Sequence, residues 1–143
     1  MEKILGIAIV NGVASCVEID DDLAAYYELL GCNCIEMPTR KIGKTNYIII
    51  CDEEGALKPN HISATNSNKE TMIVGNCFIC KEYNGDVISL EPNDIMHISR
   101  RFHRTRQIDN ESGEIRTFTV VECEYPFTVD EIIEAVTAAS DNE

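Results

Sequence analysis

The pattern of hydrophobic and polar positions predicts a chain rich in β-strands. Residues 3–10 (KILGIAIV) and 13–19 form two apolar runs, and Asn11 and Gly12 between them are a strong short hairpin signal. The run at residues 47–51 (YIIIC) is apolar without alternation, which is typical of a strand buried on both faces. The sequence therefore predicts an N-terminal β-hairpin followed by a central strand.

Turn-forming residues separate the remaining strands. Residues 39–46 (TRKIGKTN) are polar and contain a glycine, which predicts a loop. Residues 71–81 predict one strand with a bulge or a close contact at Gly75, because a glycine inside a strand often marks such a place. After a second hairpin turn at residues 83–86, a late strand is expected at residues 115–124.

An early helix is predicted between the hairpin and the central strand. Apolar residues recur at helical spacing over residues 23–30. Asp20 or Asp21 can cap its N-terminus, since an aspartate side chain accepts a hydrogen bond from a free N–H of the first turn. Gly31 follows directly, and glycine suits the left-handed position that closes many helices.

The end of the chain predicts another helix and completes the expected fold. Thr128 with Glu131 three residues later is a capping box, which predicts a helix over residues 128–139. The length of 143 residues predicts one domain, over residues 1–139, with a disordered acidic tail at 140–143. The expected class is α+β, with a mostly antiparallel sheet, an N-terminal hairpin, one early helix and two C-terminal helices.

One segment, residues 92–106 (PNDIMHISRRFHRTR), is basic in an otherwise acidic chain. Its proline at a first helical position predicts a helix over residues 92–103. At helical spacing Arg100, Arg101 and Arg104 share one face, opposite an apolar face. These cations could simply complement the helix dipole on a solvated face, or their guanidinium groups could hold a phosphate.

Composition limits the classes of function. The chain carries 12 basic and 25 acidic residues, a formal net charge of −13, and so direct nucleic-acid binding is not expected. It has no signal segment and no run of 18 apolar residues, which predicts a cytoplasmic protein with no membrane contact. The seven cysteines are an odd number and are expected to be reduced and mostly buried.

The middle of the chain resembles a known group of proteins. The stretches DEEGALKPNHISAT and MIVGNCFICKEYNGDVISLEPNDI are similar to a domain of unknown function found in small proteins of phages, plasmids and conjugative elements. The resemblance covers residues 47–101, and the opening hairpin and first helix extend it. It implies a shared fold and names no chemistry. The chain departs from the family pattern at His61, where we expect arginine in many relatives.

In size, layout and its late basic and aromatic segment, the chain also resembles the Thoeris anti-defence sponges. These small phage proteins bind the cyclic ADP-ribose signal made by bacterial TIR enzymes. The resemblance implies a phage or mobile-element protein that sequesters a nucleotide-derived immune signal, of the cyclic ADP-ribose type or a cyclic oligonucleotide, without cleaving it. No cofactor is expected. One small domain rarely encloses such a ligand, so we expect a homo-oligomer with sites between subunits.

The expected ligand site combines cations for the phosphates with groups that hold a base. Arginine forks grip phosphate oxygens, an aromatic ring stacks on the base, and an asparagine bonds its edge. The candidate residues are Arg100, Arg101, Phe102, His103, Arg104 and Arg106, together with Asn76, Tyr83 and Asn93. In a helix that runs to residue 103 Phe102 belongs to the core face, whereas a helix that ends near Ser99 frees Phe102 and His103 to line a pocket.

Other chemistry has less support in the sequence. Cys77 and Cys80 have the spacing of a metal or redox pair, but residues three apart on a strand point to opposite faces, so no metal site is expected. The three histidines are expected on the surface. No catalytic motif is present, and an enzyme is not expected, although a hydrolase of the same ligand stays open. The alternative is an acidic protein that mimics DNA or inhibits a host enzyme, with carboxylates at residues 20–22, 52–54 and 130–134.

Overall fold

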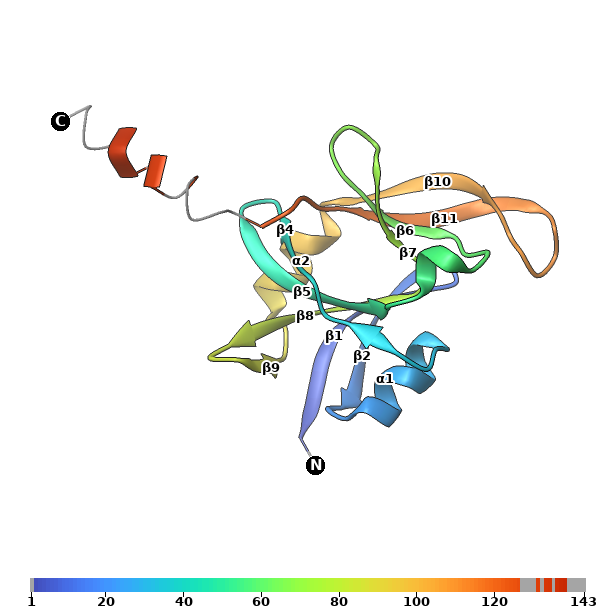
Figure 1. Cartoon of the computed structure of the whole chain (residues 1–143), viewed down its shortest axis with the longest axis horizontal. Coiled ribbons are helices and arrows are strands. Elements are labelled where there is room, and N and C mark those ends of the chain that lie inside the picture. Colours follow the sequence, from blue (N-terminus) through green and yellow to red (C-terminus); the bar gives the residue numbers. More distant parts are fainter. Residues whose placement is uncertain (1, 127–130, 132, 135, 139–143) are drawn as a thin grey trace.

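Two β-sheets pack face to face, and a helix covers the outer face of the larger one (Figure 1). The computed structural model describes residues 2–126, 131, 133–134 and 136–138. The larger sheet contains β1 (Lys3–Val10), β2 (Val13–Asp20), β3 (Ile35–Glu36), β4 (Thr39–Ile42), β5 (Thr45–Asp52), β8 (Cys77–Tyr83) and β9 (Asp86–Ile88). The smaller sheet has the order β10-β11-β6-β7, with β6 (Ile62–Thr65), β7 (Thr71–Val74), β10 (Phe102–Ile108) and β11 (Ile115–Glu122). The helices are α1 (Leu23–Leu30), the short 3₁₀ helix η1 (Gly55–Leu57) and α2 (Pro92–Ser99).

The predicted α+β class and the opening hairpin are confirmed. β1 and β2 pair along their whole length, and Asn11 and Gly12 both have positive φ in the turn, as a two-residue hairpin requires. Among the described strands, the pairing of β6 with β11 is parallel and every other pairing is antiparallel. The early helix is also confirmed, with Asp22 rather than Asp20 or Asp21 as its cap.

Side chains on the two faces of the larger sheet form two separate cores. Ile49 and Cys77 face the smaller sheet and α2, whereas Ile50, Phe78 and Cys80 face α1. β5 and β8 are therefore buried on both faces, which explains the unbroken apolar runs in their sequences. Cys77 and Cys80 do point to opposite faces of β8, as their spacing predicted.

Three stretches differ from the sequence prediction. Residues 39–46, expected as a loop, form β4 and the turn into β5, because backbone pairing with β5 satisfies their polar main chain. Residues 71–81 are two strands in different sheets, and Gly75, with φ of 92°, makes the crossing between them. The Gly75 N–H donates to the carbonyl of His61 (2.8 Å). β6, which contributes to the smaller sheet, was not predicted.

The basic segment divides into a helix and a strand. α2 ends at Ser99, so the prediction of a helix to residue 103 is wrong. Residues 102–108 pair with β11 from Phe102↔Val121 to Ile108↔Ile115. That pairing satisfies more backbone groups than one further helical turn would, and the long-range partner decides the structure.

The C-terminal prediction falls partly outside the described residues. Residues 131, 133–134 and 136–138 are helical, and the rest of the predicted helix over 128–139, like the tail at 140–143, lies outside them. All seven cysteines are free thiols, and five of them are buried. Of the described helices, none combines the length and the apolar character needed to cross a membrane.

Candidate functional site

Asp94 fixes α2 against the larger sheet and so sets where β10 begins. One carboxylate oxygen accepts a hydrogen bond from the Tyr47 hydroxyl (3.0 Å), and the other lies 3.0 Å from Lys81 Nζ and accepts the Glu91 N–H (2.9 Å). Burial opposes ionisation, but these three donors outweigh it, and the pKa of Asp94 falls below its usual value. The helix is therefore tied to β5 and β8 just before the chain turns into β10.

β10 presents its side chains alternately to two sides of the smaller sheet. Phe102, Arg104 and Arg106 share one side, because side chains two apart on a strand point the same way. Phe102 is half-buried and packs against the core between the sheets, while Arg104 and Arg106 are exposed. The structure thus brings three of the sequence-predicted site residues onto one strand face.

A cavity of about 490 Å³, the β10 hollow, lies beside this strand. Its walls come from three elements and consist of residues 12–14 of the β1–β2 turn, residues 102–104, Thr117 and Thr119. The hairpin turn is held against β11 by the Thr119 N–H, which donates to the Gly12 carbonyl (2.8 Å). The hollow offers a guanidinium, an aromatic ring and two hydroxyl groups, and its volume is within the range of small-molecule sites.

A second cavity of about 300 Å³, the β10 groove, lies between β10 and β6. It is lined by Ile62, Thr65, Lys69 and residues 103–107. His103 Nε2 lies 3.2 Å from the Thr65 hydroxyl, and the Gln107 amide exchanges hydrogen bonds with the backbone of Ile62. Because His103 and Arg104 line both cavities, the groove and the hollow adjoin along β10.

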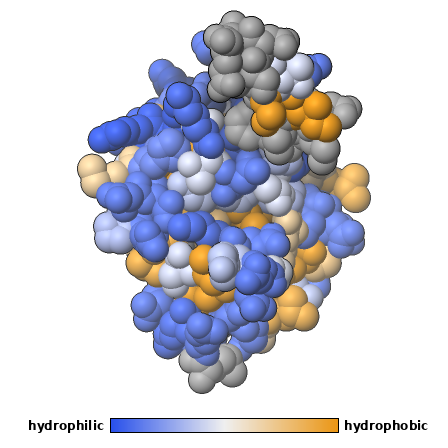
Figure 2. Space-filling view, turned by 90° about the vertical axis from the view of Figure 1, so that its left-hand side faces the viewer, coloured by the Kyte–Doolittle hydropathy of each residue, from blue (hydrophilic) through white to orange (hydrophobic). Residues whose placement is uncertain are grey.

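The charge of these cavities is opposite to that of the chain. Arg104, Arg106 and Lys69 line them, and the lining residues, all in the described part of the chain, include no carboxylate. Within residues 2–126 neither Arg104 nor Arg106 has an ion-pair partner. Hydrophilic residues cover most of the face shown in Figure 2, with apolar patches between them.

Five of the sequence-predicted site residues lie away from both cavities. Arg100 is the exposed C-cap of α2, and Arg101 pairs with Glu122 (3.4 Å) on the surface. Asn76 is occupied within the fold, because its amide accepts the Asn11 N–H and donates to the Leu30 carbonyl. The remaining two are Tyr83, at the β8–β9 turn, and Asn93, in the first turn of α2.

Sequence reasoning missed Lys69 and the two threonines of the hollow. Thr117 and Thr119 alternate with buried residues in the strand IRTFTVVE, so a period of two would have placed both on one face. That signal became useful only with the knowledge that residues 102–108 form the neighbouring strand. Lys69 gave no local signal, since it lies in a polar turn.

Groups of three or more metal-ligating side chains do not occur among the described residues. The model of the family described as "Domain of unknown function (DUF3846)" matches residues 4–103. No curated protein and no solved structure is similar enough to count as a match. The family match runs from β1 into the first two residues of β10, so Arg104, Arg106 and β11 lie beyond it.

Proposed function

The chain belongs to the DUF3846 family, and because that family's description names no function, we propose one from the chain's own cavities. The protein binds a small nucleotide-derived anion beside β10 and holds it without cleaving it. The observation that carries the proposal is the pair of adjoining cavities lined by three cations and no carboxylate, in a chain of net charge −13. Arginines without acidic partners are suited to phosphate oxygens.

The side chains of the two cavities contact different parts of a nucleotide ligand. Arg104 and Arg106 meet the phosphates, while the exposed edge of Phe102 and the threonine hydroxyls of the hollow contact the base and sugar. The resemblance to phage and mobile-element proteins leads us to an immune signal as the ligand, of the cyclic ADP-ribose type or a cyclic oligonucleotide. The role is then a sponge acting against host defence in the bacterial cytoplasm.

Oligomerisation belongs to the same proposal. β10 is the edge strand of the smaller sheet, and its unpaired backbone groups can pair with a second copy. A partner copy beside β10 covers the open side of both cavities and gives the ligand the burial that one small domain does not supply. The sites then lie between subunits.

The carboxylates that the alternative function requires are partly used within the fold. Asp21 accepts a hydrogen bond from the Tyr26 hydroxyl (2.7 Å), and Asp22 caps α1. Asp52 is paired with Lys58 (2.7 Å). Asp21 and Asp22 keep their charge, but Lys58 neutralises Asp52, so the acidic run at residues 52–54 offers less negative charge than its sequence suggests.

The test compares Arg104→Ala with Arg100→Ala, which removes the same charge outside both cavities. Each protein is titrated calorimetrically with a cyclic ADP-ribose and with a cyclic dinucleotide. Losing a charge-assisted hydrogen bond costs about 1.5–3 kcal/mol, so Arg104→Ala should bind roughly ten- to a hundred-fold more weakly. Arg100→Ala should bind as the parent does.

Three results would argue for other functions. If Arg104→Ala and Arg106→Ala bind every nucleotide as the parent does, the β10 cavities are not the site. Recovery of a cleaved nucleotide after heating the complex would indicate a hydrolase. Absence of any nucleotide binding, together with capture of one defined host enzyme and its inhibition, would support the acidic-inhibitor alternative.

A further inference from the structure

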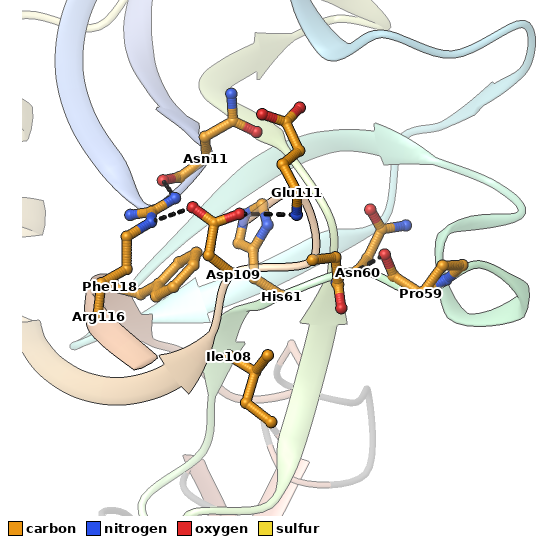
Figure 3. Close-up of a pocket in the computed structure, with 10 residues that line it drawn as sticks. Asn11, Pro59, Asn60, His61, Ile108, Asp109, Glu111, Arg116 and Phe118 are labelled. Carbon is orange, nitrogen blue, oxygen red and sulfur yellow. Dashed lines mark hydrogen bonds and ion pairs between the residues drawn. The ribbon is translucent and has the colours of Figure 1, made fainter. Parts of the chain in front are cut away.

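Figure 3 shows a third cavity, the His61 pocket. It lies on the other side of β11 from the β10 hollow. Arg116 and Phe118 of β11 line this pocket, whereas Thr117 and Thr119 line the hollow, and alternate residues of a strand point to opposite sides. The pocket has a volume of about 230 Å³. That is below the roughly 300–1,000 Å³ of sites for drug-sized molecules, so it suits one small ring system.

Stacked planar groups build the inner wall of the pocket. The His61 imidazole stacks on the Phe118 ring at 5.2 Å between centroids, and the Arg116 guanidinium lies 3.8 Å from the centroid of the same ring. Arg116 is held further by Asp109, 2.6 Å from its Nε, and by the backbone carbonyl of Asn11. The charge of Arg116 is therefore already balanced within the wall.

His61 carries an unused polar atom into this wall. Only 9% of the residue is exposed, and its Nε2 has no hydrogen-bond partner among the described residues. The prediction of His61 as a surface residue is therefore wrong. Burial, and then the nearby Arg116, lower the pKa of His61 although Asp109 opposes this, so the ring is neutral at pH 7. A buried ring nitrogen without a partner destabilises a fold, and a ligand that reaches it would recover that cost.

The rim of the pocket is rich in hydrogen-bond acceptors. The amide nitrogens of Asn60 and Asn110 donate to the backbone carbonyls of Gly55 (2.9 Å) and Pro59 (2.8 Å). Within residues 2–126 neither side-chain carbonyl oxygen accepts a hydrogen bond, so both can accept one from a ligand. The Glu111 carboxylate is exposed and has no ion-pair partner within residues 2–126. A ligand that fits must therefore donate hydrogen bonds at the rim and meet one neutral ring nitrogen inside.

From this geometry we infer that the His61 pocket binds an uncharged planar heterocycle that carries an amino group, the chemistry of adenine or cytosine. The amino group donates to the amide oxygens. His61 Nε2 is closed to solvent in the free protein, so the His61 ring turns toward the cavity when a ring atom of the base pairs with it. An anion is disfavoured because Glu111 lies at the rim and Arg116 is neutralised by Asp109. This site does not depend on the function proposed for the β10 cavities.

The first test titrates the ¹⁵N-labelled full-length protein with adenine, cytosine, uracil and methylammonium, and follows backbone amide shifts. Adenine or cytosine should give saturable shifts at residues 60–61, 109–111 and 116, and uracil, which has no amino group, and methylammonium should give none. Failure of adenine and cytosine to produce saturable shifts there overturns the inference. Equal binding of uracil or methylammonium also overturns it.

His61→Phe is the matched variant, because phenylalanine keeps a ring on Phe118 and removes Nε2. It should raise the Tm of the free protein, since a buried unpaired nitrogen is gone, and weaken binding of the amino base at least ten-fold. Unchanged binding by this variant contradicts the role given to His61. Arg100→Ala, outside all three cavities, should bind the amino base as the parent does. Shifts at residues 60–61 and 109–111 report this pocket, whereas the nucleotide titration of Arg104→Ala tests the β10 cavities, so failure of one proposal is distinguishable from failure of the other. If His61→Phe does not fold, the titrations of the parent protein with the four compounds still test the inference.

Discussion

The Asp94 carboxylate ties α2 to two strands, and Asp94→Ala removes this anchor. Tyr47 is 2% exposed, so its hydroxyl would lose its partner inside the protein. An unsatisfied buried hydroxyl costs about 1–3 kcal/mol, and loss of the capping interaction with Glu91 costs about 0.5–2 kcal/mol. Lys81 keeps some contact with water, so loss of that ion pair adds less than about 1 kcal/mol. Allowing for overlap, we expect unfolding free energy to fall by about 2–4 kcal/mol.

Guanidinium unfolding followed by far-UV circular dichroism measures this loss. Tyr47→Phe and the double variant complete a double-mutant cycle. Because Tyr47 and Asp94 are in direct contact, the cycle should give a coupling energy of at least about 0.5 kcal/mol between them. Because the pKa of Asp94 is lowered, its ionised form stabilises the fold above about pH 4, and that stability is lost as the pH falls through the folded-state pKa. Asp94→Ala should therefore show a shallower acid transition. A loss below about 1 kcal/mol, or no coupling to Tyr47, would refute this reasoning.

Two further predictions concern the β10 hollow and the His61 pocket. Phe102→Ala removes a half-buried ring, so it should cost about 1.5–3 kcal/mol in urea unfolding, less than the roughly 3–5 kcal/mol of a fully buried one, and it should also weaken nucleotide binding in calorimetry. The lowered pKa of His61 means that the unfolded chain binds a proton first, near pH 6.5, so stability should hold above about pH 7 and fall as the pH drops below 6.5. In His61→Phe, Tm measured from pH 8 to pH 5 should fall less steeply than in the parent. If Tm falls equally in both proteins, another group causes the pH dependence.

Local signals were enough to predict the hairpin, α1 and the buried strands. Asn11 and Gly12 adopt the positive φ that their types favour, and Gly31 closes α1 with φ of 68°. These features depend on a residue and its immediate neighbours, so one sequence contains the information. The end of α2 is different, because residues 102–108 are mostly polar and give little periodic signal of their own, so their pairing with β11 makes them a strand.

The candidate site could likewise be predicted only in part from the sequence. Arg104 and Phe102 could be identified from the basic segment, since their chemistry is visible in the sequence. Lys69 and Thr117 could not be placed beside them, because each cavity joins segments that become neighbours only through the strand order β10-β11-β6-β7. The burial of His61 has the same cause. Its ring meets Phe118 from a strand more than fifty positions later in the chain.

The place of β11 between β10 and β6 has a consequence for how the chain acquires its fold during synthesis. Phe118, Val120 and Val121 are almost fully buried, yet they are translated after the larger sheet, after α2 and after the stretch that matches the family. Until β11 has left the ribosome, the edge of β6 is unpaired and the core between the two sheets is incompletely covered. Exposed strand edges and apolar surface favour association with other chains. A fragment limited to residues 4–103 lacks β11 and would keep the unpaired edge of β6. The bounds of the family match are therefore poor bounds for an expressed fragment.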